Sequence, residues 1–220
     1  MANVIAFTGK KGVGKNFVAE IARRVLFEQL PMMGHGQEHR LNIEFAAFAD
    51  PMKDFLVNIV GLDRLKIYGD DNDKDSPTVY RWENMPSWLR EKFKIYEGYL
   101  TIRHALQIFG TELNREIWDQ EIWVNFMQRR IKNSEANWVL VTDARYQNEI
   151  DSIHNVGGKI WRIDGPPRGA AKKDMHSSEI SMDKLTGIDY IIINSLEDNP
   201  ETLKAKVIEG LQGCFNFGSK

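Results

Sequence analysis

A glycine-rich segment near the N-terminus constrains this chain more than any other feature. Residues 9–15 read Gly-Lys-Lys-Gly-Val-Gly-Lys, between an apolar run at 4–8 and a helical pattern that follows. Glycine reaches backbone angles closed to other residues, so successive N–H groups of such a loop can converge on an anion. A helix that begins directly after the loop adds the positive end of its dipole. The strand–loop–helix order therefore predicts an α/β fold with a phosphate-binding loop.

Lys15 supplies the mobile charge that such a loop directs at β- and γ-phosphates. The spacing is G-x-x-x-x-G-K, but Asn16 stands where Ser or Thr usually offers a hydroxyl to Mg²⁺. An amide carbonyl is a weaker ligand, which acts directly or through water. A glycine-rich turn with a surface lysine is the alternative. We expect the phosphates of a nucleoside triphosphate to be bound by Gly9, Lys11, Gly12, Val13, Gly14, Lys15, Asn16 and Phe17.

Composition narrows the class of protein. The 220 residues are 42% hydrophobic, enough for one domain over 1–220 with its own core. A net charge of −2 provides no general basic field for nucleic acid, and no run approaches the ~20 apolar residues of a membrane helix. Cys214, the single cysteine, forms no intrachain disulfide. Because the glycine-rich loop stands where a signal peptide would lie, we expect a cytoplasmic protein with neither nucleic acid nor membrane as a partner.

Strands that alternate with helices predict a mainly parallel five-stranded sheet flanked by helices. The strands are expected at 4–8, 43–48, 138–142, 159–163 and 190–193, and the helices at 14–30, from 51 onward, and at 100–114, 117–132, 146–156 and 200–211. In the first helix, Phe17, Ile21 and Val25 are expected to face the core. Asp50 is expected to cap the second helix, with Pro51 in its first turn.

Residues 61–99 interrupt this alternation with a segment rich in aromatic and charged side chains. We interpret them as an insertion between core elements, a flap on the substrate side. Its acidic run, residues 69–77, lacks the glycine and terminal glutamate spacing of a calcium-binding loop. A solvated polar loop is therefore expected there.

Asp143 follows a buried strand, at the carboxyl end where ligands bind in open α/β sheets. An aspartate in this place can hold Mg²⁺ or orient an attacking oxygen, and a simple helix cap is the alternative. Arg145 follows two residues later.

Arg103 and Gln107 are four residues apart on one predicted helix face. A guanidinium suits a phosphate and an amide suits a base or ribose, but a solvated helix face explains this spacing equally well.

A basic stretch lies between the last two predicted strands. Arg168, Lys172 and Lys173 lead to His176 and Glu179, and residues 165–185 are interpreted as a lid that closes over phosphates. His176 and Glu179 are too few for a zinc site. A solvated loop is the equal alternative.

Together these residues resemble the deoxynucleoside monophosphate kinases of tailed bacteriophages, within the nucleoside monophosphate kinase branch of P-loop proteins. The patterns Gln-x-Phe-Gly-Thr-Glu and Asp-x-Arg-x-x-Asn-Glu are much more specific than the loop alone, and a residue other than Ser or Thr after the loop lysine resembles the ordinary state of that family. Residues 61–99 match least, which leaves base selectivity open. The matching pieces are 9–15, 49–53, 103–115, 142–145 with 148–149, and 176–179.

The resemblance implies transfer of the ATP γ-phosphoryl group to a deoxynucleoside monophosphate, with Mg²⁺, in a host cytoplasm. It implies that the loop binds ATP, that the helix of Arg103 faces the monophosphate, and that Asp143 and Arg145 lie between the two nucleotides. Two alternative functions stay open: a dephospho-coenzyme-A or other small-metabolite kinase, and a regulatory module without turnover. A homodimer also stays open. The expected catalytic residues are Lys15, Asp143 and Arg145; the metal ligands are Asn16 and Asp143; the substrate-binding residues are Lys53, Arg103, Gln107, Thr111, Arg115, Asn148, Glu149, Arg168, His176 and Glu179.

Overall fold

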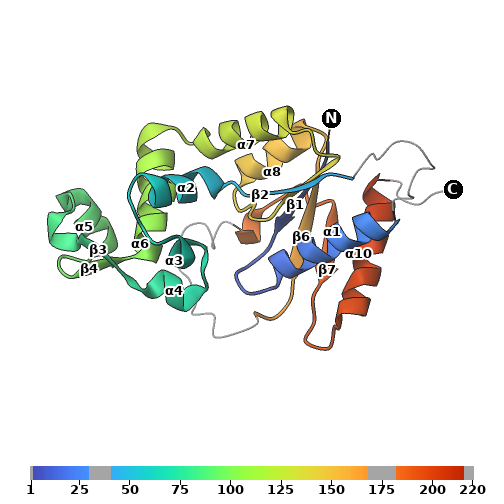
Figure 1. Ribbon diagram of the computed structural model, residues 1–220, viewed down its shortest axis with the longest axis horizontal. Coiled ribbons are helices and arrows are strands. Elements are labelled where there is room, and N and C mark those ends of the chain that lie inside the picture. The colour runs from blue at the N-terminus through green and yellow to red at the C-terminus, as the bar shows by residue number, and fades with distance from the viewer. Residues whose placement is uncertain (1, 30–40, 168–181, 216–220) are drawn as a thin grey trace. The chain divides into compact units, whose positions relative to one another are not determined.

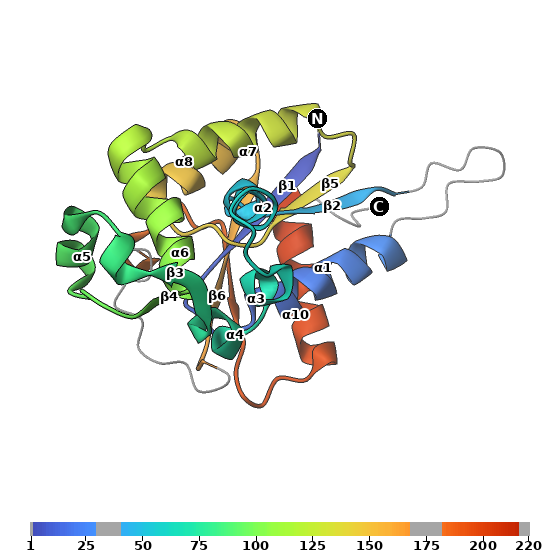
Figure 2. The same cartoon turned by 60° about the vertical axis from the view of Figure 1, so that its left-hand side comes forward.

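The computed structural model describes residues 2–29, 41–167 and 182–215. The chain divides into two compact units, residues 1–48 with 124–220, here called the sheet unit, and residues 49–123, here called the inserted unit. Figures 1 and 2 show both units from two directions. The predicted insertion at 61–99 lies inside the longer inserted unit.

A five-stranded sheet in the order β2-β5-β1-β6-β7 is the centre of the sheet unit (Figure 1). Every neighbouring pair of strands is parallel. Inner strands of a parallel sheet are covered on both faces, which explains the apolar runs of β1 and β5, whereas β2 and β6 also carry Glu44 and Arg162. The predicted mainly parallel five-stranded sheet is confirmed. The strands are β1 (Asn3–Thr8), β2 (Ile43–Ala46), β5 (Trp138–Val141), β6 (Lys159–Asp164) and β7 (Tyr190–Ile193).

Helices cover both faces of this sheet (Figures 1 and 2). α1 (Lys15–Gln29) and α10 (Pro200–Phe215) lie together on one face, and α7 (Ile122–Asn133) and α8 (Gln147–Asn155) lie on the other. Between the sheet and the first pair of helices, Trp161 and Phe7 pack edge to face with ring centroids 5.9 Å apart. Both rings are fully buried, so they help to fix the sheet against α1 and α10.

Two details of the predicted helices are wrong. Phe17 is 45% exposed, whereas Val18, Ala22 and Val25 are fully buried. These three residues recur at helical spacing, so they form the stripe that faces the core and leave Phe17 beside it. Asp50 is the first residue of α2 (Asp50–Asn58) rather than its cap, although a proline does lie in the first turn as expected.

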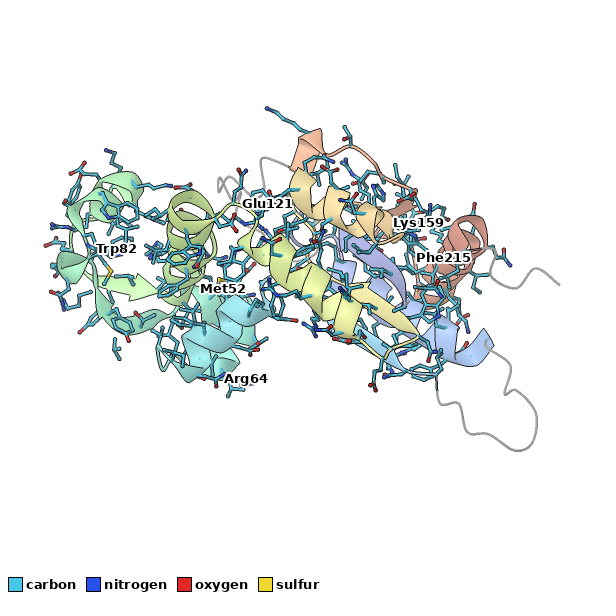
Figure 3. The ribbon with its side chains drawn as sticks, turned by 90° about the horizontal axis from the view of Figure 1, so that it is seen from above. Met52, Arg64, Trp82, Glu121, Lys159 and Phe215 are labelled. Atoms are coloured by element: carbon cyan, nitrogen blue, oxygen red, sulfur yellow. The ribbon has the colours of Figure 1, made fainter. Side chains whose placement is uncertain are left out.

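The inserted unit has two small apolar clusters of its own, which Figure 3 marks by Met52 and Trp82. Met52 packs with Leu56 and Ile67, and Trp82 packs with Leu89. No helix in the described part of the chain is long and apolar enough to cross a membrane. After α2 the elements are α3 (Arg64–Tyr68), α4 (Asp71–Asp75), β3 (Pro77–Arg81), a 3-10 turn at Trp82–Asn84, α5 (Ser87–Phe93), β4 (Tyr99–Thr101), which pairs antiparallel with β3, α6 (Ile102–Gln107) and a π-helix (Ile108–Trp118).

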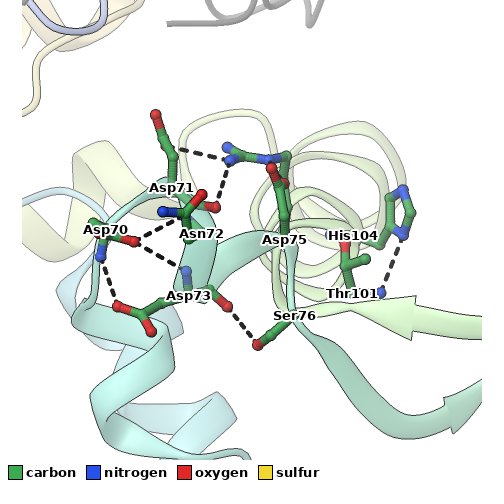
Figure 4. Close-up of polar contacts among 9 residues, drawn as sticks. Asp70, Asp71, Asn72, Asp73, Asp75, Ser76, Thr101 and His104 are labelled. Atoms are coloured by element: carbon green, nitrogen blue, oxygen red, sulfur yellow. Dashed lines mark hydrogen bonds and ion pairs between the residues drawn. The ribbon is translucent and has the colours of Figure 1, made fainter. Parts of the chain in front are cut away.

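Residues 71–75 of the acidic run form the short helix α4, so the predicted loop is wrong there, although none of these residues is buried. The Asp70 carboxylate accepts from the backbone N–H groups of Asn72 and Asp73, at 2.8 and 3.0 Å, and the Asp73 carboxylate accepts from the N–H of Asp70 at 3.1 Å (Figure 4). This reciprocal capping satisfies the N–H groups that begin the helix, and aspartates are well suited to it.

The predicted helix break at 115–116 is also displaced. α6 continues into the π-helix, which ends at Trp118, and α7 begins only at Ile122. At the end of the π-helix the N–H of Asp119 donates to the carbonyl of Asn114, five residues back, at 2.8 Å. A π-helix is bonded from i to i+5 and so has a wider turn than an α-helix, and a pattern of 3.6 residues does not locate its end.

Candidate phosphate and nucleotide site

The loops that follow the five strands meet at one edge of the sheet, because all strands run in the same direction. The glycine-rich loop at 9–14 follows β1, Phe48 lies after β2, and Asp143 lies after β5. Gly165 and Asn194 directly follow β6 and β7. The candidate site is this edge of the sheet unit.

Glycine is required at three points of the loop. Gly9, Gly12 and Gly14 have φ angles of 135°, 81° and 91°, which other residues rarely adopt. A Cβ on Gly9 would also lie 2.2 Å from the carbonyl oxygen of Ile163, and a Cβ on Gly14 would lie 2.6 Å from Nδ2 of Asn194. The loop therefore packs closely against the ends of β6 and β7, where a side chain in place of either glycine would not fit.

Lys15 is the first residue of α1, and its side chain folds back over the loop. Its Nζ donates to the carbonyl of Gly9 at 2.6 Å and to the carbonyl of Lys10 at 2.8 Å. The ammonium group is thus already held at the loop by neutral acceptors. Asn16 and Phe17 follow in the first turn of α1 and are exposed.

Asp143 joins two of the loops at this edge. Its Oδ1 accepts from the backbone N–H of Phe48 at 2.7 Å, across 95 residues of sequence. α8 begins at Gln147, and Tyr146 is the residue at its cap position. Asp143 therefore lies before the helix and is not its cap.

Glu149 determines the backbone beside Arg145. Its side chain is 2% exposed, and Oε2 accepts from the N–H groups of Arg145 and Tyr146 at 2.7 and 3.2 Å. The carboxylate satisfies donors at the start of α8, as the third residue of a helix commonly does. Asn148 lies next to it and is half-buried.

Arg103 lies on α6 and binds two carboxylates. Its Nε is 2.7 Å from Oδ1 of Asp75, and its Nη2 is 3.2 Å from Oδ1 of Asp71. Gln107 is four residues further along the helix and is also half-buried. A guanidinium that binds two carboxylate groups has the chemistry that binds a phosphate.

The other predicted substrate residues are distributed as follows. Lys53, Thr111 and Arg115 lie in the inserted unit. The Lys53 ammonium lies 4.9 Å from the ring centroid of Tyr68, and Arg115 Nη1 donates to the carbonyl of Gln120 at 3.4 Å. Arg168, His176 and Glu179, with most of the predicted lid, lie outside the described residues.

Two contacts at this edge of the sheet are not predicted from the sequence. Nδ2 of Asn194 donates to the carbonyl of Val13 in the glycine-rich loop, at 2.8 Å. The sequence signal for Asn194 is of the same kind as that for Asp143, a polar residue after an apolar strand. The second contact is the bond between Asp143 and Phe48, which no local pattern indicates.

No group of three or more His, Cys, Asp or Glu side chains in residues 2–29, 41–167 and 182–215 is arranged to hold a metal ion. Of the two predicted oxygen ligands, Asn16 lies in the first turn of α1 and Asp143 lies in the loop after β5. Oxygen ligands of this kind suit Mg²⁺ when substrate phosphates complete its coordination.

A parallel sheet in this order, with a glycine-rich phosphate loop and its lysine between β1 and α1, defines the P-loop NTPase fold in its nucleoside monophosphate kinase-like form. Residues 22–207 match the deoxynucleotide monophosphate kinase family, and the chain belongs to that family. The resemblance inferred from the motifs is thereby confirmed.

Two viral proteins are similar in sequence. A putative deoxynucleotide monophosphate kinase of Acanthamoeba polyphaga mimivirus is 30% identical over 156 residues, which cover 71% of this chain and 77% of the relative. The deoxynucleoside-5'-monophosphate kinase of Escherichia phage T5 is 31% identical over 55 residues, 25% of this chain and 22% of that protein.

Solved structures are more distant. The shikimate kinase of Aquifex aeolicus aligns with a TM-score of 0.46 at 14% identity, over 96% of this chain and 96% of that chain. The APS kinase CysC of Mycobacterium tuberculosis aligns with a TM-score of 0.46 at 12% identity, over 96% of this chain and 98% of that chain.

Proposed function

We propose that this protein transfers the γ-phosphoryl group of ATP to the 5′-phosphate of a deoxynucleoside monophosphate and so forms the diphosphate. The observation that carries the proposal is the loop at 9–14, with three glycines at positive φ and Lys15 held over it, in a chain of the deoxynucleotide monophosphate kinase family. The small-molecule substrate follows from membership of the family.

The acceptor phosphate is already an anion, so the reaction needs no strong general base. Catalysis then depends on alignment and on neutralising the charge of the transferred group. A phosphate oxygen is a stronger acceptor than a neutral carbonyl, so Lys15 is expected to exchange Gly9 and Lys10 for phosphate when ATP binds. Arg145 is proposed to act on the same group, with its backbone fixed by Glu149.

Asp143 and Asn16 are the residues proposed to hold Mg²⁺. Bound Mg²⁺ neutralises charge on the β- and γ-phosphates. Asp143 is half-buried, and its Oδ1 accepts from Phe48, which fixes the carboxylate at the edge of the sheet that carries the phosphate loop. Asn16 lies in the exposed first turn of α1, directly after Lys15.

Acceptor binding is assigned to the remaining predicted residues. Arg103 is proposed to bind the acceptor phosphate and Gln107 its base or sugar, because a fork of N–H donors suits a phosphate and an amide suits a base edge. Glu149 contributes through the backbone of Arg145. Lys53, Thr111, Arg115, Asn148, Arg168, His176 and Glu179 complete the proposed set.

A substrate panel tests the proposal. The purified protein is incubated with ATP and Mg²⁺ and each of dAMP, dCMP, dGMP, dTMP, the matching ribonucleotides and dephospho-coenzyme A, while ADP and the phosphorylated product are measured. Turnover with at least one deoxynucleotide is expected. Lys15→Ala is the matched control and should lower kcat by ~10²-fold or more.

Three results would contradict the proposal. Turnover with dephospho-coenzyme A alone would indicate a metabolite kinase on the same scaffold. Tight ATP binding with no turnover on any acceptor would indicate a regulatory module. A folded Lys15→Ala protein with normal turnover would remove the phosphate loop from the reaction.

A further inference from the structure

Asn194 joins the last strand of the sheet to the phosphate loop, although 181 residues separate it from Val13. Its side chain is 1% exposed, and Nδ2 donates to the carbonyl of Val13 at 2.8 Å. The fit around it is close: a Cβ on Gly14 would lie 2.6 Å from that Nδ2, and a Cβ on Gly165 would lie 2.3 Å from the carbonyl oxygen of Asn194.

The hydrogen bond fixes the direction of a peptide group in the loop. No cis peptide bond occurs in the described residues, and in a trans peptide the C=O and the following N–H point in opposite directions. When the Val13 carbonyl is directed at Asn194, the N–H of Gly14 must point away from β7. An oriented N–H in a glycine-rich loop is what binds a phosphate oxygen.

Asn194 is itself held in place from both sides. Its N–H donates to the carbonyl of Asp164 at 2.7 Å, and the preceding carbonyl, that of Ile193, accepts from Nζ of Lys206 at 2.7 Å. The same ammonium group binds the carboxylate of Asp198 at 2.8 Å, and that carboxylate accepts from the N–H of Ser195 at 2.7 Å. The hydrogen bonds from Lys206 and Ser195 hold the pKa of Asp198 at about 2, so this anchor stays charged at neutral pH.

We propose that Asn194 is a positioning residue for ATP. Its amide fixes the peptide between Val13 and Gly14 so that the Gly14 N–H is available to a phosphate, without contact between Asn194 and the nucleotide. This inference rests on the proposal that the loop at 9–14 binds the ATP phosphates. The inference goes beyond that proposal, because the residue responsible lies outside the loop, directly after the last strand of the sheet.

Asn194→Ala and Asn194→Asp test the inference. Alanine removes the donor, and aspartate keeps the shape but places a carboxylate oxygen against the Val13 carbonyl. Each change should raise the Kd and KM for ATP by about tenfold, the effect of one lost buried hydrogen bond. The KM for the monophosphate should change by less than about twofold, because Asn194 acts only on the phosphate loop. ATP affinity is measured by calorimetry, and KM with both substrates is measured separately.

Asn199→Ala is the matched control in the same segment. Its Oδ1 accepts from the N–H groups of Glu201 and Thr202 at 2.9 and 3.0 Å, so the change removes a cap of α10 and lowers stability without touching the loop. Melting temperatures without nucleotide are compared for both alanine variants. ATP affinity should fall only in the Asn194 variants.

Equal ATP affinity in wild type, Asn194→Ala and Asn194→Asp would overturn the inference. So would parallel losses of ATP and monophosphate affinity, which a general loss of structure produces. If Asn194→Ala does not fold, the near-isosteric Asn194→Asp decides. Failure of the proposed function is distinct, since in that case the wild-type protein itself shows no ATP turnover.

Discussion

At the scale of single residues, the sequence indicates the chemistry of a side chain, and only the structure shows which groups it binds. The guanidinium of Arg103 predicts a phosphate ligand, and in the structure it binds Asp71 and Asp75. The place of Asp143 after a strand predicts a ligand-binding carboxylate, and one of its oxygens accepts from the N–H of Phe48. In both cases the charged group is held in a fixed orientation before a ligand arrives. Such preorganisation reduces the free energy needed to order a site on binding.

Arg103→Ala should raise the KM for the monophosphate by roughly 10- to 100-fold, the effect of losing a hydrogen bond to a charged group, and leave the KM for ATP nearly unchanged. Arg81→Ala is the control, because Arg81 lies in the same unit and binds Glu83 at 2.6 Å. Steady-state kinetics with each substrate varied in turn measure both values. A rise in the KM for ATP instead would assign α6 to the wrong nucleotide.

Asp143→Asn should lower kcat strongly and raise the Mg²⁺ concentration for half-maximal rate. The amide retains an oxygen that can accept from Phe48, so the loop is kept and the charge alone is lost. Asn16→Ser is the converse change, because it restores the usual hydroxyl ligand. It should change the rate little, or it should tighten Mg²⁺ binding. Magnesium titrations of the rate, and of ATP binding by calorimetry, compare the variants. Wild-type magnesium dependence in Asp143→Asn would limit Asp143 to holding the loops together.

At the scale of elements, helix ends account for what the sequence pattern missed. α6 begins with a reciprocal cap, in which the Thr101 hydroxyl accepts from the N–H of His104 and Nδ1 of His104 accepts from the N–H of Thr101, both at 3.2 Å. The imidazole packs against Trp82 at 5.1 Å between ring centroids. Burial lowers the pKa of His104, and the charge of Arg103 lowers it further, while Asp75 opposes the shift.

The His104 cap predicts a pH dependence of stability. A histidine whose pKa is lower in the folded than in the unfolded protein resists protonation, so its protonation destabilises the fold as the pH falls below about 6.5. Protonation also removes the acceptor at Nδ1. His104→Gln keeps an acceptor for the Thr101 N–H, in the Thr-x-x-Gln form of the capping box, and cannot titrate. The melting temperature should fall more between pH 7.5 and pH 5 in the wild type than in this variant. Equal falls in both proteins would contradict the role assigned to His104.

At the scale of the whole molecule, the two units have cores of different size. The sheet unit has a continuous cluster that includes Ile5, Leu140 and Trp161, and the inserted unit has two smaller ones around Leu56 and Trp82. Because local opening free energy follows buried apolar contact, we expect native-state hydrogen exchange to give lower opening free energies in the inserted unit. Amides of β1 and β5 should exchange last. Equal values in both units would show that the chain opens only as a whole.

The sequence by itself determined the parallel sheet and the phosphate loop. Apolar runs, glycine spacing and helix signals are local, so they specify strands, turns and helices within a few residues. The motifs around Lys15, Arg103 and Asp143 identified the family for the same reason, since each is a short run of adjacent residues.

The tertiary structure alone decided how the loops at this edge of the sheet are held together. The bond between Asn194 and Val13 spans 181 residues and the bond between Asp143 and Phe48 spans 95. No local pattern specifies either pair, because the buried amide of Asn194 and the half-buried carboxylate of Asp143 bind the backbone groups that the completed sheet brings within reach. The strand order places β7 two strands from β1. That order puts Asn194 beside the phosphate loop, and it exists only in the folded protein.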